Sequence, residues 1–224
     1  MKKKFVVASL LALSLGFAAK TANQRLNDAA DVMNEIMATP DKGVPEDLLN
    51  KSACVIVVPG LKKGAFIVGA KYGKGFFVCR KERRGWSAPA AVRVEGGSFG
   101  FQIGGSETDV VMLVMNQGGV KKLLASKFTL GADASVAAGP VGRDSSAQTD
   151  AQMHAEMLTY SRSRGIFAGI SLQGATLRPD DDWNEELYGK KLSNEDIVLG
   201  TTAAPVGARR FLATLNKYSG RRTK

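Results

Sequence analysis

The chain has 224 residues, enough for one domain with short appendages, and its hydrophobic fraction of 44% is sufficient for a real core. Its 25 glycines follow no collagen-like period, and two cysteines with a single histidine offer too few ligands for a structural zinc site. The formal net charge of +10 predicts an anionic partner.

The N-terminus has the features of a secretory signal peptide. Three lysines at positions 2–4 precede the apolar run Phe5–Leu15, which is too short to span a bilayer, and small residues at 16–19 offer a cleavage site. We therefore expect a signal peptide at residues 1–19 and a periplasmic or secreted bacterial protein, with an uncleaved anchor as the alternative. Cleavage would remove three lysines and lower the formal charge from +10 to +7.

The remaining chain shows no hydrophobic run of membrane-spanning length, so we expect any association with a membrane to be peripheral. No cysteine lies near the cleavage site, which excludes lipid attachment there. Nucleic acid would also match the positive charge, but an exported protein rarely meets it. We therefore expect no nucleic-acid partner.

An amphipathic helix is predicted at Ala22–Met37, where apolar residues recur at spacings of three and four. A second, short helix opens at Pro45. A strand at Ala53–Val58 is expected to end at Pro59 and Gly60. The next two strands are predicted to form a hairpin around residues 72–75, with arms at Ala65–Lys71 and Phe76–Arg80.

Glycine pairs punctuate short apolar runs between residues 96 and 143. We predict strands at Trp86–Val94 and Val110–Met115, with strand-like alternation from Phe99 to Ile103 between them. A short helix at Val120–Leu124 follows. Because glycines inside strand patterns mark bulges or close backbone approach, we expect a tightly curved sheet that approaches a barrel.

A further hairpin is predicted from Ala155–Ser161 and Ile166–Leu172, an acidic loop begins at Asp180, and a final helix starts at Pro205. The predicted fold class is α+β, with a curved, mainly antiparallel sheet and flanking N- and C-terminal helices. No linker divides the chain, so we expect a single domain over residues 20–220 and a frayed basic tail at 221–224.

The two cysteines, Cys54 and Cys79, lie inside apolar strand-like runs. An even number of cysteines in an oxidising compartment permits one disulfide. Buried thiols that pack as small apolar side chains fit the same pattern, and we favour that interpretation. The sequence leaves both alternatives open.

Gly96–Gly100 matches the hydrolase motif G-x-S-x-G, and Asp109 or Asp133 and then His154 follow in the order of a catalytic triad. The motif requires a helix directly after the serine, whereas the residues after Ser98 alternate as in a strand. We therefore expect no hydrolase and no catalytic residue, and we interpret Ser98 as part of a glycine turn.

Sites for cofactors and metals are also not predicted. The residues Asp180, Asp182, Asn184 and Glu186 alternate at the spacing of calcium loops. The glycine that bends such loops is missing and Trp183 interrupts the series, so a solvated acidic loop is expected. A near match to a phosphate-binding loop at residues 64–71 has an extra residue and lacks the following Ser or Thr. We expect neither metal nor cofactor.

The segment from Leu61 to Arg84 contains eight basic residues and only one acidic residue, Glu82. Aromatic residues lie among them. Each basic residue near an anionic bilayer contributes about 1 kcal/mol, so such a patch would hold the protein on acidic lipid. We predict lipid binding at these turns, joined by three later arginines if the hairpins converge; ordinary solvated turn residues are the alternative. The predicted lipid-binding residues are Lys62, Lys63, Lys71, Lys74, Arg80, Lys81, Arg83, Arg84, Arg143, Arg162 and Arg164.

Several of these motifs, in this order, resemble the SYLF domain family over residues 44–189. The matching segments are residues 86–89, Phe101–Gly104 with Thr108-Asp109, Leu130–Asp133 with Ser135–Arg143, Tyr160–Gly165 with Phe167–Gly169, and Tyr188-Gly189. The resemblance implies non-catalytic binding of phospholipid, with phosphoinositides favoured in eukaryotic members.

Export makes actin an unlikely partner for this chain, and anionic bacterial phospholipid is the expected ligand. A scaffold role with an envelope protein is the alternative, for which the final helix, with Arg209 and Arg210 beside Phe211, offers a surface.

Overall fold

The computed structural model describes residues 20–39, 43–65, 68–81, 85–99, 104–141, 150–163, 166–169 and 172–219. Within these residues the chain forms one nine-stranded sheet, seven α-helices and one 3-10 helix. The predicted signal peptide and basic tail lie outside the described residues. The predicted α+β class is confirmed.

The sheet has the strand order β5-β9-β3-β2-β1-β4-β7-β6, and β8 pairs with β7. All pairs are antiparallel except β6 with β7, which confirms a mainly antiparallel sheet. The strands are β1 (Cys54–Ala65), β2 (Val68–Cys79), β3 (Ala90–Phe99), β4 (Gly104–Val114), β5 (Phe128–Thr129), β6 (Val136–Ala138), β7 (Met157–Ser163), β8 (Ile166–Gly169) and β9 (Thr176–Pro179).

The first helix has the predicted bounds, and Thr21 and Gln24 form a capping box at its start. The predicted final helix is also present, preceded by a 3-10 helix at Val206–Ala208. The helices are α1 (Ala22–Met37), α2 (Glu46–Lys51), α3 (Gln117–Leu124), α4 (Asp150–His154), α5 (Asp181–Tyr188), α6 (Asn194–Val198) and α7 (Arg209–Ser219).

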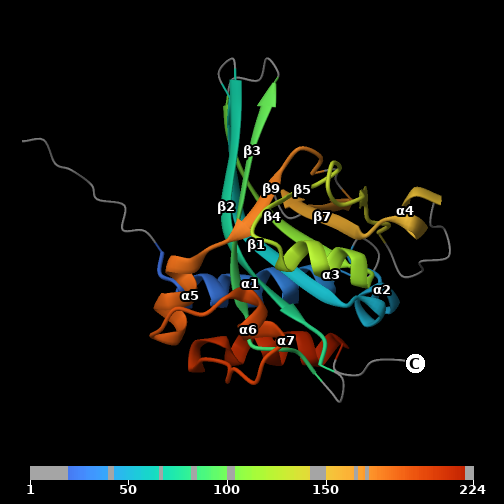
Figure 1. Ribbon diagram of the computed structural model, residues 1–224. Coiled ribbons are helices and arrows are strands. Elements are labelled where there is room, and N and C mark those ends of the chain that lie inside the picture. Colours follow the sequence, from blue (N-terminus) through green and yellow to red (C-terminus); the bar gives the residue numbers. More distant parts are fainter. Residues whose placement is uncertain are drawn as a thin grey trace, which may run out of the picture.

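The base of the sheet is buried on both faces, because strand side chains alternate between two hydrophobic clusters. Val55 and Val57 point to the face covered by α1, α2, α5 and α7, which we call the α1 face. Ile56 and Val58 point to the opposite face, where α3, α6 and the strands β5 and β9 pack, which we call the α3 face. Helices therefore surround the lower half of the sheet (Figure 1).

A β-bulge interrupts the central strand β1 at Pro59 and Gly60. The pairing shifts by one residue against both neighbours, so Val58 and Leu61, three residues apart, both lie in the α3-face cluster. Gly60 has a φ of +59°, and a proline is tolerated in a central strand only at such an irregularity. In β2, a Cβ at Gly75 would lie 2.1 Å from the Val57 carbonyl oxygen, so only glycine fits beside the bulge.

Beyond the bulge, the distal halves of β1–β4 leave the body as a four-stranded projection, which we call the finger. Figure 1 shows β2 and β3 rising clear of the helices. β9 pairs with β3 only from Val92 to Glu95, and β7 pairs with β4 only from Asp109 onward. Among the described strands, the finger therefore has no outer neighbour beyond Glu95. The finger comprises residues 62–65, 68–72, 95–99 and 104–107.

Three predictions about local structure are wrong. The predicted turn at residues 72–75 lies inside β2, and the chain instead reverses between Ala65 and Val68, because the glycines there accommodate the bulge across the sheet. The predicted strand end at Pro59 is the bulge itself. The predicted acidic loop at Asp180 is the start of α5, where that side chain accepts a hydrogen bond from Trp183 N–H.

The hairpin of β7 and β8 is confirmed, whereas the predicted strand before Val94 begins only at Ala90. The alternation predicted from Phe101 to Ile103 lies outside the described residues.

Cys54 and Cys79 form a disulfide, so the favoured interpretation as free thiols is wrong. They are direct cross-strand partners in the register of β1 and β2, which brings their Cβ atoms together. The sequence could not decide this question, because the register depends on the bulge. Both cysteines are buried.

We expect the Cys54→Ala/Cys79→Ala variant to lose about 3 kcal/mol of unfolding free energy, because the bond closes a loop with a sequence separation of 25 residues. Urea denaturation of both proteins, each with and without reductant, measures the difference. Reductant should lower the midpoint of the natural chain alone. Equal midpoints for the natural chain under both conditions would show that the disulfide does not stabilise the fold.

We expect Gly60→Ala to lower the unfolding free energy by at least about 1–2 kcal/mol, because its positive φ disfavours a side chain. The new Cβ would also lie 2.2 Å from Glu107 Oε1. Gly64→Ala is the matched control in the same strand, where a Cβ meets nothing within 4 Å. Equal thermal midpoints for the two variants would contradict this account of the bulge.

Candidate functional site: the cations of the finger and the body

The structure does not gather the eleven predicted lipid-binding residues into one patch. We had predicted that Lys62, Lys63, Lys71 and Lys74 lie in turns. This is wrong, because all four lie within the strands β1 and β2. Lys71 and Arg80 are nine positions apart along β2 and its extension, which corresponds to about 30 Å of strand. The cations therefore divide between the finger and the opposite end of the body.

Arg80 is a structural clamp at that opposite end. Its guanidinium stacks on Trp86 at 3.8 Å and donates to the carbonyl of Leu49 at 2.9 Å. It also donates to the carbonyl and hydroxyl of Ser219, the last residue of α7, and to the carbonyl of Ser52 after α2. One cation thereby satisfies carbonyl groups at two helix C-termini, where positive charge is favoured.

Lys74 forms an ion pair with a buried carboxylate. Its ammonium lies 2.8 Å from Oδ2 of Asp180, whose side chain is 0% exposed, and 4.7 Å from the ring of Trp183. Trp183 in turn stacks on Phe76 of β2. A buried charge is costly unless it is paired, so Lys74 compensates the carboxylate that caps α5.

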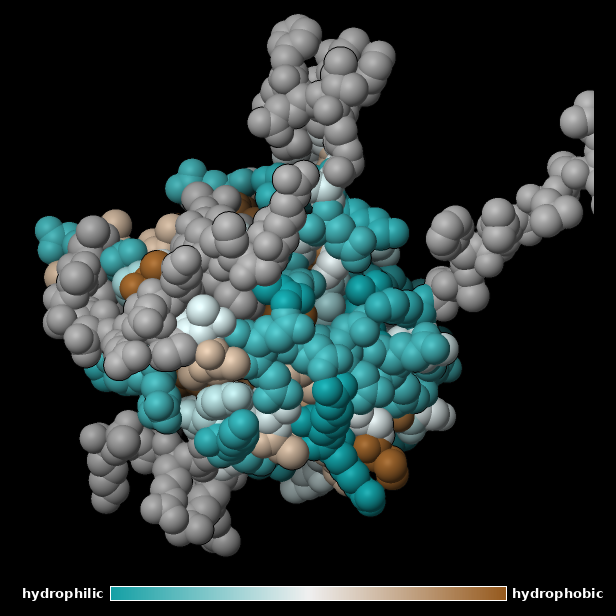
Figure 2. Space-filling model, turned by 180° about the vertical axis from the view of Figure 1, so that it is seen from behind, coloured by the Kyte–Doolittle hydropathy of each residue, from teal (hydrophilic) through white to brown (hydrophobic). Residues whose placement is uncertain are grey.

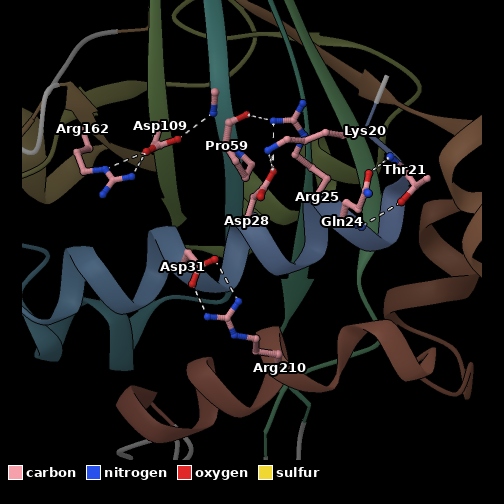
Figure 3. Close-up of polar contacts among 11 residues, drawn as sticks. Lys20, Thr21, Gln24, Arg25, Asp28, Asp31, Pro59, Asp109, Arg162 and Arg210 are labelled. Atoms are coloured by element: carbon pink, nitrogen blue, oxygen red, sulfur yellow. Dashed lines mark hydrogen bonds and ion pairs between the residues drawn. The ribbon is translucent and has the colours of Figure 1, made fainter. Parts of the chain in front are cut away.

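Arg162 is held by two acids beside the bulge. Its Nε donates to Asp109 Oδ2 at 2.9 Å, as Figure 3 shows. Its guanidinium also contacts Glu35 of α1. The other oxygen of Asp109 accepts the Gly60 N–H at 2.9 Å. Burial raises the pKa of the Asp109 carboxyl, and the hydrogen bond from Gly60 opposes that rise. Arg162 therefore serves the bulge.

A polar hollow of about 200 Å³ lies beside this network, between α1 and the sheet. Arg25 donates to the Pro59 carbonyl at 3.0 Å, and Lys20 contacts Asp28 at 2.7 Å. Figure 3 shows these side chains converging above α1, each cation turned toward an oxygen. Acidic residues balance the bases that line the hollow, so it is a poor site for an anion.

Lys63 and Lys71 differ from these cations, which are bound to carbonyl or carboxylate groups of the protein. They are direct cross-strand partners in the finger, and Gly96 and Ser106 extend the same row across β3 and β4. The period of two from Phe77 puts this row on the α3 face. Burial, and then the charge of Lys71, lower the pKa of Lys63. Like charges directly opposite each other are destabilising unless an anion joins them.

No acid pairs with either lysine among the residues that the structure describes. On the α1 face of the finger the next row is Glu95, Tyr72, Lys62 and Glu107. Here Lys62 stands opposite Glu107, and Glu95 contacts two arginines of β3 and β9. One face of the finger is therefore cationic, and the other is mixed in charge.

Of the other predicted residues, Lys81 is exposed at the far end of the body. Arg83, Arg84, Arg143 and Arg164 lie outside the described residues. Lipid binding by any of the eleven stays a prediction. Ser106 and Gly96, which complete the lysine row, were not predicted, because only the strand register places them there.

Exposed large hydrophobic side chains are scattered in the described part of the chain. They include Tyr72 of the finger, which is 47% exposed. Figure 2 shows the back of the molecule, where hydrophilic residues cover most of the described surface. In its described residues the finger is thus distinguished by charge and shape more than by a broad apolar patch. The other exposed large hydrophobic side chains are those of Val141, Met153, Leu199 and Val206.

The motif around Ser98 does not form a nucleophile elbow. Ser98 lies within β3, which continues to Phe99, so our interpretation of Ser98 as part of a glycine turn is wrong. The next described element is the strand β4. Asp109 is bound to Arg162, and Asp133 accepts the Thr129 N–H at 2.7 Å in a turn. Among the described residues, no cluster of three or more metal-ligating side chains is found, and no helix is long and apolar enough to cross a membrane.

The fold and the site define an α+β protein with a cationic finger on a helix-covered sheet. The family described as "Ysc84: Las17-binding protein actin regulator" matches residues 95–218, more than half of the chain. The chain therefore belongs to the Ysc84 family, also known by its SYLF domain, as the sequence motifs predicted. The match extends beyond Tyr188 and includes α6 and α7.

Curated relatives align with most of this chain. SH3 domain-containing YSC84-like protein 1 of Rattus norvegicus is 33% identical over 181 residues, 80% of this chain and 53% of the relative. SH3 domain-containing protein PJ696.02 of Schizosaccharomyces pombe is 34% identical over 77% of this chain and 41% of its own length. LAS seventeen-binding protein 3 of Saccharomyces cerevisiae is 33% identical over 74% and 36%. The chain thus spans about half, or less, of these relatives.

We expect Arg80→Ala to lower the unfolding free energy by about 2–4 kcal/mol, because carbonyl groups of α2 and α7 lose a charged donor. Lys81→Ala, its exposed neighbour, should stay within about 0.5 kcal/mol of the natural chain. Chemical denaturation measures both. An Arg80→Ala protein of natural stability that fails to bind anionic vesicles would restore Arg80 as a ligand residue.

Proposed function

We propose that this protein binds anionic phospholipid without catalysing a reaction, and that Lys63 and Lys71 of the finger contact the lipid phosphate. The observation that carries the proposal is this lysine pair, which is cross-strand, half-buried and without an acid partner among the described residues. A phosphate between the two ammonium groups would remove their mutual repulsion. Ser106, exposed in the same row, offers a hydroxyl donor.

The expected strength is moderate. Each lysine near an anionic surface contributes about 1 kcal/mol, so the pair supplies a reversible interaction that salt weakens. Tyr72, exposed on the other face, is of the residue type that favours the membrane–water interface. The three cations of the finger and this tyrosine together fit a peripheral mode of binding.

The proposed location is the bacterial envelope, which follows from the signal peptide expected at residues 1–19. Phosphoinositide binding, which the family resemblance implies for eukaryotic members, would there be replaced by binding to bacterial anionic phospholipid. The same expectation makes actin an unlikely partner.

A protein partner is the second candidate, and the names of the relatives favour it. The yeast relative is named a LAS seventeen-binding protein, and the family description names Las17 and actin regulation. Under this alternative the chain would be an envelope scaffold that uses another surface, such as α7. Arg209 is exposed there, whereas Arg210 is bound to Asp31 of α1. Partners that remain in a pull-down after lipid extraction would support it.

We expect Lys63→Gln/Lys71→Gln to bind phosphatidylglycerol-containing vesicles about 30-fold more weakly, since two contributions of about 1 kcal/mol are lost. Vesicle flotation measures binding, and higher salt should weaken the natural chain. Lys190→Gln/Lys191→Gln, which removes two exposed lysines after α5, is the control and should bind almost normally. Equal losses in both variants would indicate a general charge effect and contradict the assignment to the finger.

A further inference from the structure

The lysine row lies at a boundary of charge along the finger. From Gly64 to Ala70 and from Gly96 to Gly105 the sequence contains no charged residue. The structure aligns these uncharged segments, because Gly64 pairs with Ala70 and with Gly105 in adjacent strands. All described charges of the finger therefore lie toward the body, in the lysine row and the row below it.

The finger is also thin in the two rows directly beyond this boundary. Two successive rows, Gly97-Ala70-Gly64-Gly105 and Ser98-Gly69-Ala65-Gly104, consist of small residues. A Cβ built on Gly64 would meet nothing within 4 Å, so the backbone there is open on that side. Four strands span about 15 Å between the outer two, so a narrow blade displaces few lipid headgroups.

The described part of the uncharged rows is long enough to reach an interfacial depth. Val68 and Phe99 form the last described pair of β2 and β3, three positions beyond Lys71. Three positions correspond to about 10 Å, and elements that lie in the membrane interface penetrate about 5–10 Å.

The unpaired outer edges of the finger limit how deep it can enter a membrane. Beyond Glu95 in β3 and before Asp109 in β4, the outer edges pair with no described strand. Unpaired backbone groups cost several kcal/mol each in hydrocarbon, but the headgroup layer contains water and phosphate that can satisfy them. The edges therefore favour the headgroup layer over the bilayer core.

We propose that the finger enters the headgroup layer of an anionic membrane end-on, with Lys63 and Lys71 at the level of the phosphates and the uncharged rows deeper. This inference rests on the proposed lipid binding and adds to it an insertion surface. Attraction by the lysines alone would disappear at high salt, whereas the inserted rows contribute a part of the binding that salt does not screen.

The test is a fluorescence measurement on the full chain labelled at Gly64→Cys with the environment-sensitive dye NBD. The native cysteines are bonded and buried, so under non-reducing conditions the dye reacts with the new thiol. Ala70→Cys, the cross-strand partner of Gly64, is a second site in case the first variant folds poorly. Glu185→Cys, exposed on α5, is the control on the body.

Phosphatidylglycerol-containing vesicles should shift the emission of the finger label to the blue and leave the control label unchanged. Lipids that carry a spin label near the headgroup should quench the finger label more strongly than lipids labelled near the bilayer centre. If the protein floats with vesicles and the finger label does not respond, the insertion is wrong and the lipid binding stands. Failure to float overturns both.

A blue shift that grows with protein concentration in the absence of vesicles would indicate that a second copy covers the finger, and would also overturn the insertion. A blue shift with soluble glycerol phosphate alone would assign the response to the phosphate and not to a membrane surface. That result would also overturn the insertion.

Discussion

The bulge in β1 is the constraint on which the rest of the structure depends. It adds one residue to the central strand, at the point where the sheet that is buried on both faces passes into the exposed finger. The bulge exposes polar backbone groups at a buried position, and these need partners. Arg25 satisfies the Pro59 carbonyl and Asp109 satisfies the Gly60 N–H, so α1, β4 and β7 are tied to this point through charged side chains.

The cations discussed above fall into two groups according to the chemical groups that they contact. Arg80, Lys74 and Arg162 contact helix carbonyls or carboxylates that are buried or half-buried. Loss of the cation there would leave a desolvated polar group without that partner. Lys63 and Lys71 meet each other. The first group stabilises the fold and is unavailable to a ligand. The second group carries a local repulsion that an anion would relieve, which is why the proposed function rests on it.

Shape and charge act together in the finger. Small residues make the distal strands thin, the absence of charge permits contact with the interfacial layer, and the lysine row marks where the charged surface begins. The open strand edges oppose deep burial, because their backbone groups need water or phosphate. The headgroup layer meets both requirements, because it accepts the uncharged rows and supplies water and phosphate to the open edges. The proposed lipid binding and the proposed insertion therefore use the same finger and require no conformational change.

The sequence by itself determined the fold class, α1, the apolar strands and the family, because these follow from local periodicity and from motifs in order. It also identified Lys63 and Lys71, but only as two cations among eleven. The tertiary structure alone decided the bulge, the disulfide, the cap at Asp180 and the commitments of Arg80, Lys74 and Arg162. Each of these depends on strand register or on contacts between residues distant in the chain. One extra residue in β1 reverses the face of every later side chain in that strand, and composition carries no record of that shift.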